Sequence, residues 1–191
     1  MICQNAAVKR AIDAMQFTET HLPGAYTLDF ERREDQRGFF AHAWSQSEFA
    51  RHGLNTTIVD INFSYNCTRG TLRGMHFQRS PFAQVKVVRC TRGAIYDVIV
   101  DLRPHSPTFQ RWIGVELSAT NHTALYVPEG FAHGFQTLED DCEVTYLVSQ
   151  VYAPGAEGGL RYDDPAFGIT WPKAVEVISE RDLAWPAFAG A

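Results

Sequence analysis

The sequence contains no long hydrophobic run. No stretch of about 18 consecutive apolar residues, the length that a transmembrane helix requires, occurs in its 191 residues. The first 20 residues also lack the apolar segment of a secretory signal peptide, because Lys9, Arg10 and Asp13 interrupt them. We therefore expect a soluble cytoplasmic protein that has no membrane partner.

An excess of positive charge is also lacking. Seventeen Lys and Arg residues stand against 22 Asp and Glu residues, which gives a formal net charge of -5. Because nucleic-acid binding needs a basic face, this balance argues against a nucleic-acid partner. It remains compatible with a local pocket of basic side chains for a single diphosphate.

Cysteine is scarce and widely spaced. The four cysteines are Cys3, Cys67, Cys90 and Cys142, and no two of them form a CxxC pair. This spacing gives no basis for a structural zinc site, and 191 residues can bury a core without disulfides. We expect buried free thiols in a reducing compartment.

Short strand-like segments dominate the chain from Ala25 onward. Runs rich in β-branched and aromatic residues alternate with turns rich in Gly, Pro and Asp. These runs are residues 57–61, 85–89, 94–100, 112–117, 124–127 and 144–148. Strands at this spacing, without a long helical period between them, are typical of an all-β sandwich or barrel.

The remaining segments complete a one-domain organisation. Residues 1–24 are predicted to form an N-terminal leader or arm, with weak helical spacing over residues 1–20, and residues 25–191 the domain. A short helix is expected over residues 45–52, where Gly53 provides the stop. The stretch from residue 154 onward is predicted to be an ordered loop that packs on the barrel, because its tryptophans would be costly to expose.

One segment, residues 70–78, concentrates polar groups within a strand-like pattern. In a strand, His76 and Gln78 share one face, while Met75 and Phe77 share the other. His76 could therefore point into the mouth of a barrel. The alternative is a core histidine whose hydrogen bond is satisfied by a backbone carbonyl.

Two other segments carry an isolated polar side chain. Lys86 lies between valines, so its side chain lies on the opposite face of the strand from theirs. The same pattern is expected of a lysine on the solvated face of an edge strand. His133 lies between aromatic residues and glycines, which is unusual for a plain hairpin. The alternative to a functional role is that His133 caps the turn.

Inward-facing histidines in a barrel suggest either metal binding or acid–base catalysis. A metal site needs three or four converging ligands, but no histidine follows His76 at the usual spacing, and Asp97 and Asp101 are weak candidates. We therefore predict no metal and no cofactor. A neutral histidine, a carboxylate, a tyrosine and a lysine or arginine supply every group needed for acid–base catalysis, although spacing alone does not show that they converge.

The motifs from residue 25 to 185 resemble the dTDP-4-dehydrorhamnose 3,5-epimerase family, whose members are cupin-type jelly rolls. The matching segments are residues 35–40, 70–78, 83–90, 95–103, 106–109, 127–135, 152–154, 163–165, 168–169 and 171–172. This resemblance implies an all-β jelly-roll (cupin-like) sandwich or barrel with few short helices.

The resemblance also implies roles for individual residues. The family's general base falls on His76, its paired carboxylate on Asp182, the opposing acid on Tyr146 and the lysine near the substrate's keto group on Lys86. Substrate-binding positions fall on Arg37, Arg73, Gln78, His133, Glu157 and Arg181, and on His42, where many members carry Glu.

The function implied by the resemblance is cofactor-independent epimerisation of a nucleotide-linked 4-keto-6-deoxy sugar. Such enzymes invert C3 and C5 of dTDP-4-dehydro-6-deoxyglucose on the route to dTDP-rhamnose and polysaccharides. A homodimer that exchanges an N-terminal strand is implied as well, with Arg37 serving the neighbour's site. The alternatives are a 3-epimerase, a 3,4-ketoisomerase on a related sugar nucleotide, or a non-catalytic cupin that binds sugar nucleotides.

The sequence departs from the family pattern at several positions. Besides His42, residues 59–65 differ from the usual Gln-Asp-Asn segment, one extra residue lies between Ser64 and Arg73, and Leu147 replaces a common Lys or Gln. These departures concern contacts to the nucleotide and the sugar more than the proton-transfer set.

Overall fold

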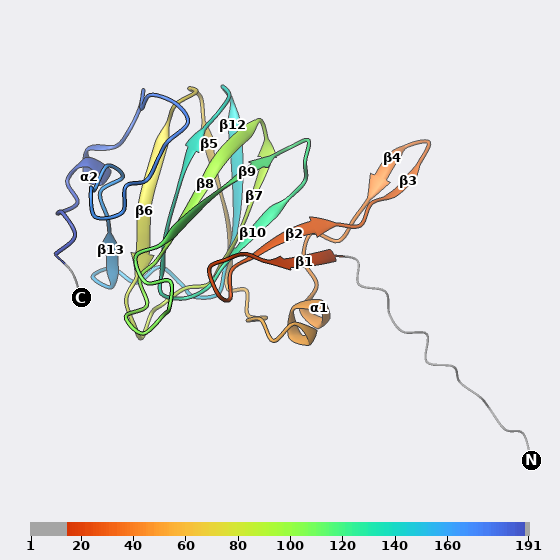
Figure 1. Ribbon diagram of the computed structural model, residues 1–191. Helices are drawn as coiled ribbons and strands as arrows, with labels where there is room; N and C mark the ends of the chain where they lie inside the picture. The colour runs from red at the N-terminus through yellow and green to blue at the C-terminus, as the bar shows by residue number, and fades with distance from the viewer. Residues whose placement is uncertain (1–14, 190–191) are drawn as a thin grey trace, which may run out of the picture.

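Two antiparallel β-sheets packed face to face form the body of the protein (Figure 1). The structure is a computed structural model, and it describes residues 15–189. In sheet order, the six-stranded sheet comprises β1 (Met15–Glu19), β2 (Tyr26–Phe30), β10 (Ala124–Val127), β7 (Lys86–Arg92), β12 (Cys142–Val148) and β5 (Asp60–Asn66). The five-stranded sheet comprises β13 (Glu157–Gly159), β6 (Leu72–Gln78), β11 (Phe131–Thr137), β8 (Ala94–Asp101) and β9 (Trp112–Ser118).

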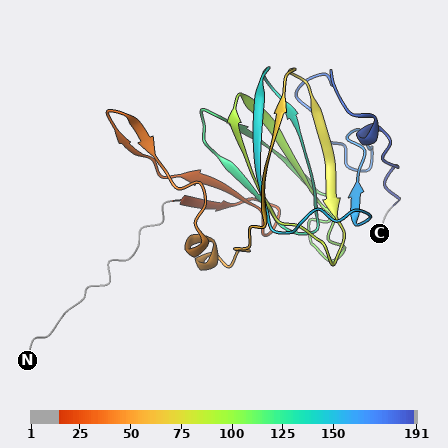
Figure 2. The ribbon, with the colours of Figure 1, turned by 180° about the vertical axis from the view of Figure 1, so that it is seen from behind.

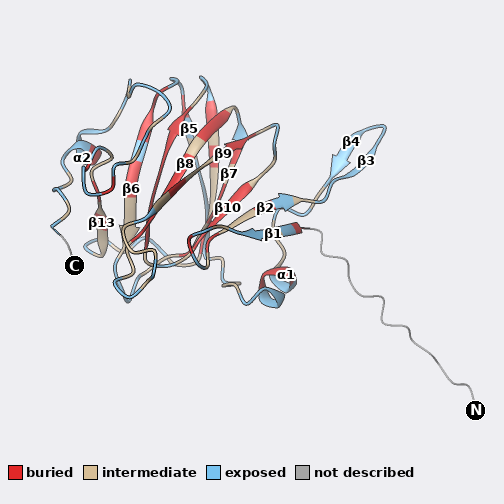
Figure 3. Ribbon diagram, viewed as in Figure 1, coloured by how far each residue is buried: buried red, intermediate tan, exposed pale blue. Residues whose placement is uncertain are grey.

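A small hairpin projects from this body. It is formed by β3 (Arg33–Asp35) and β4 (Gly38–Phe40), and all six of its strand residues are exposed. Figure 2 shows the hairpin and the two sheets from behind, and Figure 3 shows that exposed residues make up the hairpin, whereas buried residues lie along the strands of the body. The hairpin therefore makes no contribution to the core between the sheets.

The main core lies between the two sheets, and it follows from the two-residue period of the strands. Alternate residues of β7, β8, β11 and β12 point inward, as Val88, Ile99, Phe135 and Val144 do. A second cluster covers the outer face of the six-stranded sheet, where Phe49 of helix α1 (Gln46–Arg51) is fully buried. The predicted all-β jelly-roll sandwich and the short helix near residues 45–52 are confirmed.

The N-terminal prediction needs a correction. Met15–Glu19, predicted as part of a weakly helical leader, form strand β1 and pair with β2. Pairing with β2 and the burial of Met15 override the weak helical spacing of this segment, which is too short to form a stable helix by itself. Residues 1–14 lie outside the described residues. The strand predicted at residues 57–61 begins at Asp60 and continues to Asn66.

The C-terminal segment packs against the outer face of the five-stranded sheet. Leu160 and Phe167 are buried there beside Met75, and Trp171 packs against the same cluster. The predicted ordered loop is confirmed in outline, but it also contains the short elements β13 and α2 (Glu180–Leu183). Figure 1 shows that α2 and β13 lie beside β6, so this segment reaches the strand that carries His76.

The cysteine prediction is confirmed for two positions. Cys90 and Cys142 are buried free thiols, whereas Cys67 is exposed, and Cys3 lies outside the described residues. None of the helices in residues 15–189 has the length and apolar character required to cross a membrane.

Candidate active site

Polar side chains interrupt the apolar core at one end of the space between the sheets. His133 follows Phe131 on the inward face of β11, and Asp97 follows Ile95 on the inward face of β8. From the opposite sheet, Tyr146 packs partly buried against the same core. Because a polar group in such a position costs free energy unless it is paired, these side chains form a functional candidate.

His76 and Asp182 form a hydrogen-bonded pair. His76 Nε2 lies 2.6 Å from Asp182 Oδ1, and Asp182 Oδ2 accepts a hydrogen bond of 3.1 Å from the backbone N–H of Gly74. Helix α2 positions the carboxylate, because Ser179 caps this helix and accepts from the Asp182 N–H. The alternative of a core histidine that bonds a backbone carbonyl is therefore wrong.

The carboxylate of Asp182 is ionised despite its burial. Burial by itself raises the pKa of Asp182, but the hydrogen bonds from His76, Gly74 and Ser179 and the charge of His76 outweigh it and lower the pKa below the usual range. An ionised carboxylate accepts the hydrogen of His76 Nε2. The tautomer with a free lone pair on Nδ1 follows from this arrangement.

His76 opens onto a cavity of about 190 Å³. The residues that line it come from β6, β7, β13, α2 and the loops beside them: His76, Phe77, Gln78, Gln84, Lys86, Tyr152, Glu157, Gly158 and Arg181. The prediction that His76 and Gln78 share a face is confirmed. Met75 and Phe77 pack on the other face, in the cluster on the outer side of the five-stranded sheet. Five of the residues predicted for the site thus meet at one cavity.

Lys86 enters this cavity from the six-stranded sheet. Its strand β7 lies between β10 and β12, so the alternative of an edge strand is wrong. Burial lowers the pKa of Lys86 to about 8, and the charge of Asp97 acts in the opposite direction. Lys86 is a cation at neutral pH that titrates in the mildly alkaline range.

His133 lies directly across from His76 in the pairing of β11 with β6. Its Nε2 is 2.8 Å from Asp97 Oδ1, and both side chains are buried. Burial lowers the pKa of His133 against the opposing effect of Asp97, so His133 stays neutral near pH 7. The alternative in which His133 caps a turn is wrong, because the residue lies within a strand.

Close approach of β6 and β11 depends on a glycine. The register of the two strands shifts between His133 and Phe135. Gly74 lies at this shift with φ of 130°, and a Cβ atom there would lie 2.6 Å from the Cα of Gly134. A larger residue at position 74 would push the two strands apart and separate the two histidines.

Tyr146 and Arg73 are held by the edge strand β5. The Tyr146 hydroxyl lies 3.0 Å from Ser64 Oγ, and Arg73 Nε donates a hydrogen bond of 2.6 Å to Asn66 Oδ1. Burial raises the pKa of Tyr146, an effect that the Ser64 hydrogen bond opposes. The ring of Tyr146 meets the ring of His133 edge-on at 6.2 Å between centroids. Tyr146 therefore carries a protonated hydroxyl, and its ring adjoins His133.

The mouth of the cavity carries an ion pair. Arg181 donates to the carboxylate of Glu157, which also accepts a hydrogen bond of 2.5 Å from the Tyr152 hydroxyl. Gln78 holds two neighbouring loops, since its side-chain amide donates to the backbone carbonyls of Phe82, between β6 and β7, and of Val151, between β12 and β13. Arg181 is more than half exposed, so its guanidinium is accessible to an anionic ligand.

Two predicted binding residues lie elsewhere in the chain. Arg37 is exposed at the turn of the β3–β4 hairpin and pairs with Asp35 at 2.5 Å. His42 is exposed and meets the ring of Phe40 edge-on at 5.6 Å. Neither side chain lines the cavity of the same chain.

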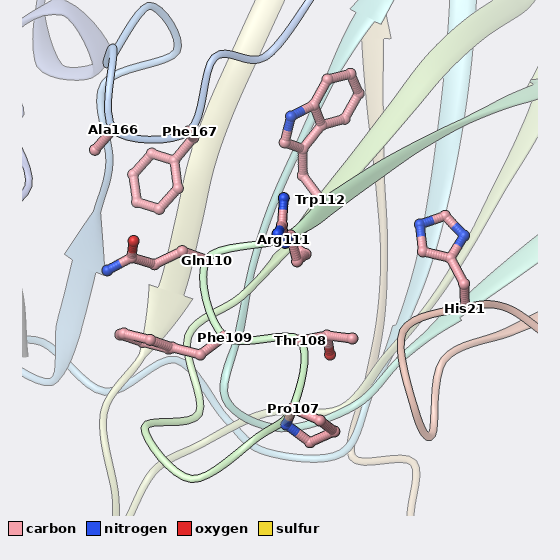
Figure 4. A pocket seen from close by; sticks show the side chains of 9 residues that line it. All are labelled: His21, Pro107, Thr108, Phe109, Gln110, Arg111, Trp112, Ala166 and Phe167. Atoms are coloured by element: carbon pink, nitrogen blue, oxygen red, sulfur yellow. The ribbon is translucent and has the colours of Figure 1, made fainter.

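A larger hollow of about 660 Å³ lies at the loop between β8 and β9 (Figure 4). Its lining includes Arg111 and Trp112 together with His21, Phe109 and Phe167. None of the side chains around it forms a histidine–carboxylate pair, and none belongs to the predicted site. The smaller cavity at His76 therefore remains the better candidate for catalysis.

Several residues near the site do not stand out in the sequence. Gln84 and Tyr152 line the cavity, and Ser64 and Asn66 hold other site residues. Gln84 lies two residues before Lys86, and a two-residue strand period would have found it. Ser64 and Asn66 depend on the pairing of β5 with β12, which spacing along the chain does not reveal.

In residues 15–189, no group of three or more His, Cys, Asp or Glu side chains is arranged to hold a metal ion.

The fold and the cavity define a cupin-like jelly-roll enzyme whose site is suited to proton transfer. A family model described as dTDP-4-dehydrorhamnose 3,5-epimerase matches residues 19–190. The dTDP-4-dehydrorhamnose 3,5-epimerase of Sinorhizobium fredii is 42% identical over 177 residues, which are 92% of this chain and 91% of that protein. The chain belongs to the dTDP-4-dehydrorhamnose 3,5-epimerase family and is a carbohydrate epimerase.

Solved structures agree with this assignment. The dTDP-4-dehydrorhamnose 3,5-epimerase of Bacillus anthracis, with TDP and PPi bound, matches with a TM-score of 0.89 and 41% identity over 92% of this chain and 100% of that one. A 3'-monoepimerase from Streptomyces bikiniensis, in complex with dTDP-quinovose, matches with a TM-score of 0.82 and 35% identity over 88% of this chain and 85% of that one.

Proposed function

We propose that the protein converts dTDP-4-dehydro-6-deoxyglucose to dTDP-4-dehydrorhamnose by inverting C3 and C5, with His76 as base and Tyr146 as acid. The observation that carries this proposal is the His76–Asp182 pair at a cavity shared with Lys86. The C–H bonds at C3 and C5 are acidified because both carbons adjoin the 4-keto group. The reaction therefore needs a base, an enolate stabiliser and an acid, and it needs no oxidant.

His76 Nδ1 removes the proton. The Nε2 hydrogen is directed to the ionised carboxylate of Asp182, which leaves Nδ1 as the acceptor and stabilises the imidazolium that forms. The half-exposed His76 ring lines the cavity, so a bound sugar can reach it. General base catalysis of this kind contributes about 100- to 10,000-fold to the rate.

Lys86 and Arg73 stabilise the enolate. When the C–H bond breaks, the electron pair forms a C=C bond and negative charge develops on the 4-oxygen. A lysine cation in a partly buried position interacts with that charge more strongly than it would in water. Asn66 fixes the guanidinium of Arg73, so this second positive charge is held in place.

Tyr146 completes the inversion by delivering a proton to the enolate carbon from the other side. Tyr146 lies on the six-stranded sheet, whereas His76 lies on the five-stranded sheet. Burial, which raises the pKa of Tyr146, keeps its hydroxyl protonated until the enolate forms. The new C–H bond then has the opposite configuration, and the same two groups act at the second carbon.

Product analysis tests this proposal against its alternatives. Incubation with dTDP-4-dehydro-6-deoxyglucose is expected to give the doubly inverted 4-keto sugar. Inversion at C3 alone would identify a 3-epimerase, which has precedent in the Streptomyces bikiniensis neighbour. Movement of the carbonyl to C3 would identify a ketoisomerase, and an unchanged sugar would identify a binding protein.

Activity is expected to fall above pH 8. Lys86 must be a cation to stabilise the enolate, and its pKa is lowered to about 8. Each pH unit above 8 therefore removes most of the enzyme that carries a protonated Lys86. The measurement is kcat/KM from pH 6 to 10. Substitution of Lys86 by Arg, which stays charged throughout this range, should move or remove the alkaline limb at a lower overall rate. An alkaline limb that is unchanged in this variant would contradict the role of Lys86.

The diphosphate is expected to bind at the mouth of the cavity. Arg181 supplies the accessible positive charge there, while Glu157 and Tyr152 orient its guanidinium. The nucleotide is expected to need Arg37 and His42 as well. Both side chains lie on or near the projecting hairpin, away from the cavity of their own chain.

We further propose a homodimer in which the hairpin of one subunit reaches the site of the other. The outward side chains Ile61 and Phe63 of β5 are 67% and 73% exposed, and Phe40 on the hairpin is 61% exposed. Large apolar side chains that are exposed in this way favour a partner subunit that covers them. Cytoplasmic location remains a prediction from the sequence.

Complementation between two inactive variants tests the dimer. Arg37→Ala and His76→Ala are each expected to be strongly impaired when expressed alone. When they are coexpressed, each mixed dimer contains one site with both native residues, so random pairing should restore about one quarter of wild-type activity. Size-exclusion chromatography checks the oligomeric state. Coexpression that restores no activity would show that Arg37 does not serve the neighbour's site.

A further inference from the structure

The edge strand β5 presents a hydroxyl to the acid Tyr146. Ser64 Oγ lies 3.0 Å from the Tyr146 hydroxyl, and the Ser64 side chain is half-buried. In the pairing of β12 with β5, Val144 is opposite Ser64 and Tyr146 is opposite Asn62, so the serine and the tyrosine are diagonal neighbours. Diagonal neighbours on one face lie within reach when one of them has a long side chain.

Tyr146 must regain a proton after each inversion. In each inversion the imidazole of His76 gains the proton of the broken C–H bond, and Tyr146 loses the proton that forms the new C–H bond. His76 must therefore release a proton to water, and the Tyr146 phenolate must regain one. Because burial raises the pKa of Tyr146, a phenolate left in this position is unfavourable, and its return to the hydroxyl form needs a proton donor.

Ser64 is the hydrogen-bonding group that meets the Tyr146 hydroxyl among residues 15–189. A serine hydroxyl can donate its hydrogen to the phenolate while its oxygen accepts a hydrogen from water, so the serine itself is unchanged. β5 is the outermost strand of its sheet, and Ser64 is not fully buried, so water can reach the far side of its oxygen. Arg73, anchored by Asn66 of the same strand, further favours the anionic form of Tyr146.

We propose that Ser64 is a positioning residue for Tyr146 that aims its hydroxyl at the substrate and connects its oxygen to water for reprotonation. This inference rests on the proposed function and extends it, because it assigns the acid side of the reaction to β5. Loss of the Ser64 hydroxyl impairs proton delivery, whereas removal of the substrate proton by His76 proceeds as before.

The test compares Ser64→Ala with Ser64→Thr in deuterated water. Two rates are measured by proton NMR: deuterium incorporation into substrate that keeps its configuration, and formation of inverted product. Ser64→Ala is expected to lower the inversion rate about tenfold or more, with incorporation into unchanged substrate retained. Ser64→Thr keeps the hydroxyl and should restore the wild-type ratio of the two rates. Thermal unfolding of both variants monitors the stability of β5.

Two outcomes would overturn the proposal. One is an equal loss of exchange and inversion in Ser64→Ala. Such a loss would show that the substitution loosens β5 and disturbs the whole site, rather than the delivery of the proton by Tyr146. The other is an inversion rate that stays within twofold of wild type. Failure of the proposed function would look different, because the wild-type protein itself would then exchange no substrate proton.

Discussion

Replacement of His76 by alanine is expected to abolish both proton exchange and epimerisation. The variant lacks the base that accepts the C3 and C5 protons, and no other histidine among residues 15–189 lines the same cavity. Loss of a general base lowers the rate by about 100- to 10,000-fold, so the remaining activity should lie near the limit of detection. The measurement is exchange of substrate protons with deuterated water, followed by proton NMR.

A matched variant separates this effect from a general disturbance of the site. His133→Ala removes the histidine directly across from His76, but it leaves the His76–Asp182 pair intact. Exchange in His133→Ala should therefore persist, although substrate binding and packing suffer. Activity of His76→Ala within tenfold of wild type would refute the assignment of the base.

Replacement of Tyr146 by phenylalanine is expected to separate exchange from inversion. The ring and its contacts to His133 and Phe135 remain, while the hydroxyl that donates the second proton is lost. Product formation should fall by about 100-fold or more, because inversion needs a proton from the side opposite His76. Deuterium should still enter substrate that keeps its configuration, because His76 can remove a proton and return a deuteron.

Both rates are needed to interpret this variant. Equal losses of exchange and inversion in Tyr146→Phe would point to a different acid. The same variant also tests the inference about Ser64: if Ser64 acts through Tyr146, adding Ser64→Ala to Tyr146→Phe should cause no further loss of inversion.

The sequence predicted the β architecture well because the strand signals are local. Alternating apolar residues on β7, β8 and β12 and the turn residues between them are sufficient to place these strands. β1 was missed because its five residues become a strand through pairing with β2 rather than through their own pattern. Short strands of this kind depend on tertiary contacts, which the spacing of residues along the sequence does not reveal.

The site could be predicted in part. The alternation along β6 placed His76 on the face away from Met75, and the structure agrees. The resemblance supplied Asp182 as its partner, because a carboxylate 106 residues away in the chain cannot be found from local spacing. Ser64 and Asp97 needed the structure, since their roles arise from neighbouring strands that bring them to Tyr146 and His133.

The position of Lys86 illustrates why the context of a strand decides the outcome. The pattern of valines around it is the same for an edge strand and for a central strand, and the two contexts give opposite expectations for the pKa of the amine. Placement between β10 and β12 buries the side chain and lowers that pKa to about 8. Local sequence therefore identified the face of Lys86, and strand order determined its chemistry.

The most direct test of the central claim is proton NMR of dTDP-4-dehydro-6-deoxyglucose with the wild-type protein in deuterated water. The proposed reaction predicts loss of the signals of both the C3 and the C5 proton, together with the appearance of the doubly inverted sugar. Retention of both signals by a folded protein would contradict the claim.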